Sequence, residues 1–459
     1  MPPVPPCPHE NLVVEVSALA ANVSQRSRRS QPVSLEQRRA ATTASGRCPP
    51  PTTEGSNDGD VSGQGVLRDD AATFPAPLLL PGDDLALDPK HPPQSLRSFI
   101  NGDHRNKVTA KRRTLYVAGS PVIDEEVAWL ADTVEPTRPS TKRKASSTAR
   151  LGGPRTSDVR EYLAAFYHGM GVEEMEPAFT LVAWDEQSKK KGTTQYVGLR
   201  TGASCRRIRV RPCPDGAFGR QLNLTDILDA LIENLPRDAY AVVLVVRHDL
   251  YEDDEDEFCC GRAYGGSRVA VVSSARYHPA LDDREDIDRV HMWPASHCQS
   301  YVDSLLALDD SGIPSRSTAA ATTQDSPLQA AVKAAALSKN PRSASDLEGL
   351  WFSRVARTAA HELGHCLGMG HCVYYACLMQ GTAGIAEDCR QPPYLCPVCL
   401  RKVTRAMTEY TPGLSEETYV SDRYRSLLAV SKRWHNVAMF AGFEAWLAAI
   451  LQPPSAGEP

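Results

Sequence analysis

The chain has 459 residues, with 51 Lys and Arg against 56 Asp and Glu, which gives a formal net charge of −5. This balance provides no strong attraction to nucleic acids or acidic membrane surfaces, and we expect neither as a partner. The 13 cysteines are scattered or clustered along a long chain, unlike those of a small disulfide scaffold, so metal binding and reduced thiols explain them better.

The first 110 residues are predicted to be a disordered, low-complexity tail. Residues up to about 95 are rich in Pro, Ser, Thr, Ala and Gly and poor in aromatics, which is typical of disordered segments. Glu10 and Glu15 interrupt the only apolar stretch near the N-terminus, so we expect no signal peptide. No apolar run reaches the roughly 20 residues of a membrane span, and the expected location is the cytoplasm or the nucleus.

Ordered structure is expected from about residue 111 onwards, as strands that alternate with helices. Strands are predicted near 115–117, 179–183, 207–211, 240–246 and 268–274, and helices over 122–135, 158–170 and 224–235. The continuous apolar run at 240–246 is typical of a buried central strand. Three polar stretches, at about 136–156, 186–204 and 308–345, are interpreted as insertions. This order predicts an α+β fold with a mixed, twisted sheet backed by helices.

A long helix is predicted to follow the third insertion. Ser345 stands three residues before Glu348, which is the spacing of a capping box, and an apolar stripe follows it. This helix runs into the sequence His-Glu-Leu-Gly-His at 361–365. Residues 406–459 are predicted to form a C-terminal helical extension.

The end of this helix has the pattern of a catalytic zinc site. His361 and His365 are four residues apart, so both lie on one side of the helix and can hold one ion. Gly368 permits a sharp turn that can bring His371 back as a third ligand, which leaves one position open for water. Glu362 lies about 100° round the helix from His361, where it can act as a general base towards zinc-bound water. The alternative is a helix whose histidines are only polar surface residues.

Four cysteines after the histidines predict a second, structural zinc site. They form two close pairs, which suits a closed tetrahedral site: Cys372, Cys377, Cys396 and Cys399. The alternative is redox chemistry at the C-x-x-C pair, although no thioredoxin-like context accompanies it. Cys389 lacks a close partner and is left out of the site, and Cys366 is interpreted as a packing residue.

Together the two motifs resemble those of the archaemetzincin family. Residues 361–371 match the metzincin pattern HExxHxxGxxH, and Cys372, the triplet 377–379 and the C-x-x-C pair follow in the family's order. A block at 249–278, with D-L-Y at its start and A-R-Y near its end, also resembles a family block. The resemblance covers roughly residues 110–435. It implies a metzincin-like zincin fold with a zinc-stabilised C-terminal subdomain, in which Met379 forms a hydrophobic floor beneath the catalytic zinc.

These observations predict a zinc-dependent metallopeptidase domain over residues 111–405 that acts on peptides or proteins. Two zinc ions per chain are expected, one catalytic and one structural. The resemblance implies an aminopeptidase-like activity on short peptides. The alternative is a catalytically weak, zinc-stabilised interaction module, but such a module has no physical need of Glu362. The pattern predicts no particular oligomeric state.

Overall fold

The structure, a computed structural model, describes residues 9–15, 33–48, 70–103, 105–137, 151–184, 195–307, 320–321, 326–338 and 341–452. The chain divides into two compact units. The first unit contains the residues up to 103, residues 286–340 and the residues from 369 onwards, and the second contains 104–285 and 341–368. Each unit therefore combines segments that lie far apart in the sequence.

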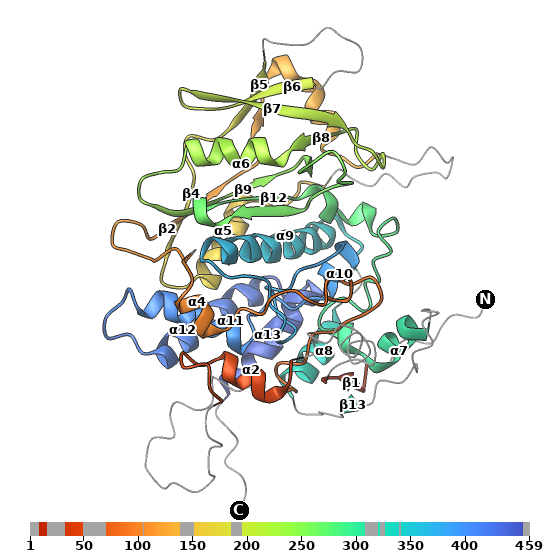
Figure 1. Ribbon diagram of the computed structural model, residues 1–459. Helices are drawn as coiled ribbons and strands as arrows, with labels where there is room; N and C mark the ends of the chain where they lie inside the picture. The colour runs from red at the N-terminus through yellow and green to blue at the C-terminus, as the bar shows by residue number, and fades with distance from the viewer. Residues whose placement is uncertain are drawn as a thin grey trace, which may run out of the picture. The chain divides into compact units, whose positions relative to one another are not determined.

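The second unit has two β-sheets with helix α6 (Leu224–Glu233) between them, as Figure 1 shows. In spatial order, the larger sheet consists of β10 (Asp249–Tyr251), β8 (Arg220–Asn223), β7 (Ser204–Pro212), β6 (Gln195–Thr201), β5 (Thr180–Ala183) and β3 (Val122–Ile123). The smaller sheet consists of β11 (Gly261–Tyr264), β12 (Val269–Ser273), β9 (Ala239–Val246), β2 (Thr114–Ala118) and β4 (Gly171–Glu174).

Strand β9 is the centre of the smaller sheet. It pairs in parallel with β2 on one side and β12 on the other, and each of its residues is buried. Helices α5 (Thr156–Phe166) and α9 (Ala344–Cys366) cover the face opposite to α6 (Figure 1). A strand covered on both faces is expected to be apolar throughout, so the prediction of a buried central strand is confirmed. The mixed sheets and their covering helices likewise confirm the coarse α and β architecture.

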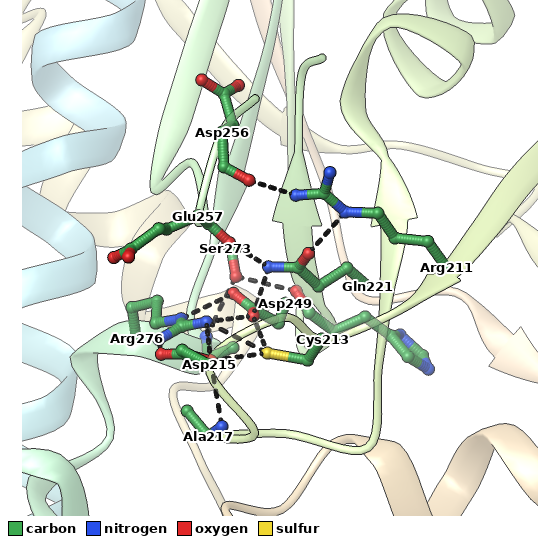
Figure 2. A network of polar contacts seen from close by, with 12 residues as sticks. Arg211, Cys213, Asp215, Ala217, Gln221, Asp249, Asp256, Glu257, Ser273 and Arg276 are labelled. Atoms are coloured by element: carbon green, nitrogen blue, oxygen red, sulfur yellow. Dashed lines mark hydrogen bonds and ion pairs between the residues drawn. The ribbon is translucent and has the colours of Figure 1, made fainter. Parts of the chain in front are cut away.

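A buried ionic network holds the segment after β12 to the larger sheet (Figure 2). The guanidinium of Arg276 has no solvent exposure and forms 2.6 Å ion pairs with Asp249, at the start of β10, and with Asp215. The rings of Phe258 and Phe218 lie 4.1 and 5.5 Å from its central carbon. Asp249 and Arg276 belong to the D-L-Y and A-R-Y ends of the block at 249–278. The two ends of that block are therefore joined by a desolvated ion pair.

Breaking this ion pair should destabilise the second unit. We expect Arg276→Met to lower the free energy of unfolding by about 3–5 kcal/mol, because the substitution leaves a buried carboxylate without its counter-charge. Denaturant unfolding measures this loss. Arg284→Gln is the matched control, since Arg284 contacts the same Asp215 at 3.0 Å from a solvent-exposed position and should cost about 1 kcal/mol or less. Equal losses for the two variants would show that burial of Arg276 carries no special weight.

The first unit is mainly helical. Its helices are α2 (Leu35–Ala41), α3 (Asp84–Leu87), α4 (Leu96–Ile100), α7 (Gln299–Ala307), α8 (Pro327–Leu337), α10 (Ile385–Arg390), α11 (Pro397–Thr408), α12 (Glu416–Arg433) and α13 (Ala438–Leu451), and its short strands are β1 (Leu12–Val13) and β13 (Ala320–Ala321). Helix α13 packs against α8 and α12, while α11 packs against α12 and α4. None of the helices in the described part of the chain is both long and apolar enough to cross a membrane.

Parts of the predicted disordered tail are folded in this unit. Helices α2, α3 and α4 lie within residues 33–48 and 70–103, and Phe74 is buried against Tyr394 and Trp446. The structure differs from the expectation because these apolar residues follow no local period. They are buried by helices encoded more than 300 positions later, which composition does not reveal. The rest of the predicted tail is outside the described residues, except for the segment 9–15.

Three local predictions also differ from the structure. The range 122–135 holds strand β3 and a 3-10 helix (Glu125–Thr133) instead of one helix, and the insertion at 186–204 contains strand β6, which pairs with both β5 and β7. Helix α9 is capped by Ser343, which forms the capping box with Asp346. The competing spacing from Ser345 fails because Glu348 instead accepts a hydrogen bond from the backbone N–H of Gly152 at 2.6 Å.

Candidate active site

Helix α9 carries three of the predicted catalytic residues near its C-terminal end. The Nε2 atoms of His361 and His365 lie 3.0 Å apart on adjacent turns, and both rings are partly exposed. Two nitrogen ligands of a tetrahedral zinc ion, each about 2.0–2.1 Å from the metal, lie roughly 3.3 Å from one another. The histidine pair therefore has a spacing that fits one zinc ion.

Glu362 is buried between the two histidine positions and faces strand β11. A Cβ atom placed on Gly261, the first residue of β11, would lie 3.0 Å from Oε1 of Glu362 and 3.2 Å from its Cγ. Only glycine leaves room for the carboxylate at this point. Burial raises the pKa of the nearby Cys259 thiol to about 12, and the charge of Glu362 raises it further. The surroundings of this carboxylate thus include a thiol that stays neutral at physiological pH.

The segment that follows β12 anchors α9 within the second unit. Arg354 forms a buried bidentate ion pair with Asp282, with N–O distances of 2.7 and 2.9 Å. The indole N–H of Trp351 donates to the backbone carbonyl of Ser274 at 2.7 Å. A third contact joins the hydroxyl groups of Thr358 and Tyr277 at 2.8 Å. These contacts come from successive turns of α9 and therefore set both its rotation and its position along the sheet.

The helix ends at the predicted glycine. Gly368 has φ +91°, a left-handed conformation that residues with a side chain rarely adopt, and its N–H donates to the carbonyl of His365 at 2.9 Å. His371 follows three residues later and belongs to the first unit.

Within the first unit, His371 has two neighbours that sequence reasoning missed. The ring of His91 lies 5.5 Å from the ring of His371. A Cβ atom on Gly381 would lie 2.9 Å from Nδ1 of His371 and 2.4 Å from Oδ2 of Asp84, so the imidazole and the carboxylate border the same glycine. Asp84 and His91 were missed because they lie in the range predicted to be disordered. The Pro-Gly-Asp-Asp sequence there indicated only a turn.

The four predicted structural ligands gather in the first unit. All four are buried, and their sulfur atoms lie within 4.8 Å of one another: Cys372, Cys377, Cys396 and Cys399. None is in a disulfide, and the sulfurs of Cys372 and Cys396 are 3.6 Å apart. A tetrahedral zinc ion with Zn–S bonds of about 2.3 Å separates its sulfurs by roughly 3.8 Å. The donor set therefore fits one zinc ion.

Backbone groups support this cluster from outside. The N–H groups of Met379 and Cys396 point to the sulfur of Cys377 at 3.5 and 3.3 Å, which favours a thiolate. Met379 is fully buried, and its carbonyl accepts a hydrogen bond from the N–H of Cys372 at 2.6 Å. Two other buried cysteines, Cys366 and Cys389, lie outside the group. Burial raises the pKa of the Cys366 thiol, as expected for a neutral packing residue.

Removing one sulfur from the cluster should destabilise the first unit. We expect Cys396→Ser to lose about one zinc ion per chain and to lower the melting temperature by more than Cys389→Ser does, because closed thiolate sites supply folding energy. Cys389 is the matched control, since it is buried in the same unit but is no member of the group. Elemental analysis and thermal unfolding provide the two measurements. Equal zinc content in both variants would contradict a zinc ion at the four sulfurs.

Comparisons with known proteins agree with these motifs. Residues 329–405, which hold both motifs, match the model of peptidase family M54. The chain is 24% identical to archaemetzincin-2 of Rattus norvegicus over 326 residues, which cover 69% of this chain and 66% of the relative. It is 31% identical to archaemetzincin-1 of Homo sapiens over 218 residues, or 46% of this chain and 37% of the relative. The chain thus spans about two thirds or less of these two relatives.

A solved archaemetzincin structure from Methanopyrus kandleri is also similar, with a TM-score of 0.31, 16% identity, and coverage of 65% of this chain and 97% of that one. The family model and the relatives match the part of the chain that carries the histidine and cysteine motifs. The chain therefore belongs to the archaemetzincin family of zinc metallopeptidases.

Proposed function

We propose that this chain hydrolyses peptide bonds, with Glu362 as the general base. The supporting observation is that the buried Glu362 carboxylate stands on α9 directly beside two histidine nitrogens 3.0 Å apart. The proposed zinc ligands are those two histidines, His361 and His365, together with His371 of the same motif. When bound, zinc lowers the pKa of a coordinated water towards about 7 and polarises the peptide carbonyl.

The protein's own contribution is to hold and move a proton. Glu362 accepts a proton from the attacking water and returns it to the nitrogen of the leaving amine. The anchoring of α9 by Trp351 and Arg354 keeps this carboxylate in one position during the reaction. Such positioning matters because a shift of about 1 Å can cost 10²-fold in rate.

Strand β11 is proposed to hold the substrate backbone. It forms the edge of the smaller sheet, with β12 on one side only. An edge strand presents main-chain N–H and C=O groups that an extended peptide can pair with. Because Gly261 at the start of β11 touches Glu362, a peptide aligned on this edge brings a backbone carbonyl close to the base. Main-chain pairing of this kind favours extended peptides over folded proteins.

Two finer assignments belong to the same proposal. One zinc ion is assigned to the histidines and one to the four buried sulfurs, and Met379 is assigned to the floor of the catalytic site. The aminopeptidase-like activity is supported by the family resemblance alone. Cleavage of matched peptides with a free and with an acetylated N-terminus tests it, since an aminopeptidase requires the free amine.

Glu362→Gln separates the enzyme from the interaction module. Peptidase activity should fall by about 10² or more, the usual scale for loss of a general base, while zinc content stays at the wild-type level. Hydrolysis of a peptide library and elemental analysis provide the measurements. Glu417→Gln, at an exposed position in the first turn of α12, is the control and should leave both unchanged. If wild type and Glu362→Gln cleave the library equally, or neither cleaves, the interaction-module alternative takes the place of the enzyme.

Gly261→Ala tests the contact between β11 and the base. The added methyl group meets the Glu362 side chain at 3.0–3.2 Å, so the carboxylate must shift by a few tenths of an ångström. We expect kcat/KM to fall about 10-fold or more, with little change in melting temperature. Gly266→Ala is the matched control, because no described atom lies within 4 Å of the added methyl group there. Unchanged kinetics in Gly261→Ala would separate β11 from the catalytic base.

A further inference from the structure

A third group of metal-binding side chains lies in the first unit, apart from both zinc sites proposed above. His9, His291 and Cys298 each offer one ligand atom, and these atoms lie within 4.8 Å of one another. Imidazole nitrogens and a thiolate are the usual ligands of zinc. The three residues come from two segments far apart in the sequence, so the fold brings them together.

Main-chain pairing sets the position of this group. Leu12 forms an antiparallel bridge with Cys298, and the N–H of Gln299 donates to the carbonyl of Asn11 at 2.9 Å. These bonds align the segment 9–15 with the start of α7. The proximity of His9 to Cys298 therefore follows from backbone structure as well as from side-chain conformation.

His291 is oriented as a metal-binding histidine is. Its Nδ1 lies 2.6 Å from Oδ2 of Asp288, and its ring stacks on Tyr301 with centroids 4.2 Å apart and an angle of 6° between the planes. A carboxylate can only accept a hydrogen bond, so Nδ1 carries the proton and the lone pair of a neutral ring is on Nε2. The same carboxylate–histidine arrangement orients zinc-bound histidines in many proteins.

The other two members are also suited to a metal. The Nε2 atom of His9 is buried and has no hydrogen-bond partner among the described residues, and its ring meets that of His291 edge to face with centroids 5.2 Å apart. A buried polar nitrogen without a partner is destabilising unless something binds it. Cys298 is 2% exposed, and its sulfur lies 3.3 Å from the hydroxyl of Ser300, which can donate to a thiolate.

We propose that His9, His291 and Cys298 form a further metal site that binds Zn²⁺. Its role is structural: the ion joins the N-terminal segment at 9–15 to the segment 288–301. A cross-link between residues so distant in the sequence restricts the unfolded chain and so stabilises the folded first unit. The site uses none of the residues of the proposed peptidase mechanism, so either assignment can fail without the other.

Zinc content of the full-length chain tests the proposal. Wild type, His9→Gln and Cys298→Ala are loaded with Zn²⁺, freed of excess metal by gel filtration and subjected to elemental analysis. Each variant should hold about one zinc ion fewer per chain than wild type. The matched controls are His435→Gln and Cys205→Ala, whose side chains are exposed and outside every metal-binding group of the described residues. They should keep the wild-type content.

A spectroscopic measurement identifies the sulfur ligand. When Co²⁺ replaces zinc, a bound thiolate gives a charge-transfer absorption, so the spectrum of wild type minus that of Cys298→Ala should contain this band. Unchanged metal content in both variants, or the absence of the difference band, would overturn the proposal and leave His9 and His291 as a packing pair. Peptidase activity serves as an independent readout, and we expect His9→Gln to retain it.

Hydrogen exchange provides a measurement that does not depend on a variant's stability. In wild type, Zn²⁺ should slow amide exchange in residues 9–15, because the ion holds this segment in place. His9→Gln should lack this protection even if Cys298→Ala fails to fold. Equal exchange with and without Zn²⁺ in wild type would contradict the proposed cross-link.

Discussion

The geometry of the candidate active site depends on a guanidinium that has no contact with water. Desolvating Arg276 is costly, and its attraction to carboxylates repays this cost only where the geometry is good. Here Asp249 and Asp215 both lie 2.6 Å from the guanidinium, and two aromatic rings cover it. The network therefore holds the segment after β12 in one conformation. That segment in turn supplies the contacts that position α9: the carbonyl of Ser274, the hydroxyl of Tyr277 and the carboxylate of Asp282.

A rigid α9 has a direct chemical consequence. The helix packs on β11 and β12, so the base Glu362 and the edge strand proposed to bind substrate are parts of the same folded unit. The exclusion of a side chain at Gly261 shows how closely the two approach. In the first unit, the cysteine group begins at Cys372, directly after His371. Bound metal there would fix the main chain next to that histidine without occupying any position needed for chemistry.

Sequence reasoning recovered the elements whose signal is local and missed those that depend on distant partners. The apolar run of β9 and the amphipathic pattern of α6 were predicted correctly, because burial on two faces and burial on one face leave different periods in the sequence. Strand β6 was missed because it follows a lysine-rich stretch, although its buried residues Val197 and Leu199 alternate as in a strand. The folded segments at 33–48 and 70–103 were missed because their apolar residues pack against helices that follow much later in the chain.

The sequence by itself determined the family and the candidate ligands. Histidines four apart on a helix, a glycine at its end and cysteines in close pairs are encoded within the forty residues or so from His361 onwards, where spacing along the chain defines which side chains can share an ion. Only the tertiary structure decided what surrounds these residues. Gly261 beside Glu362, Asp84 beside the same glycine as His371, and His9 near Cys298 are all non-local pairs. Their proximity results from strand order and helix packing, and because each partner has its own unremarkable local sequence, no pattern in the chain predicts that they meet.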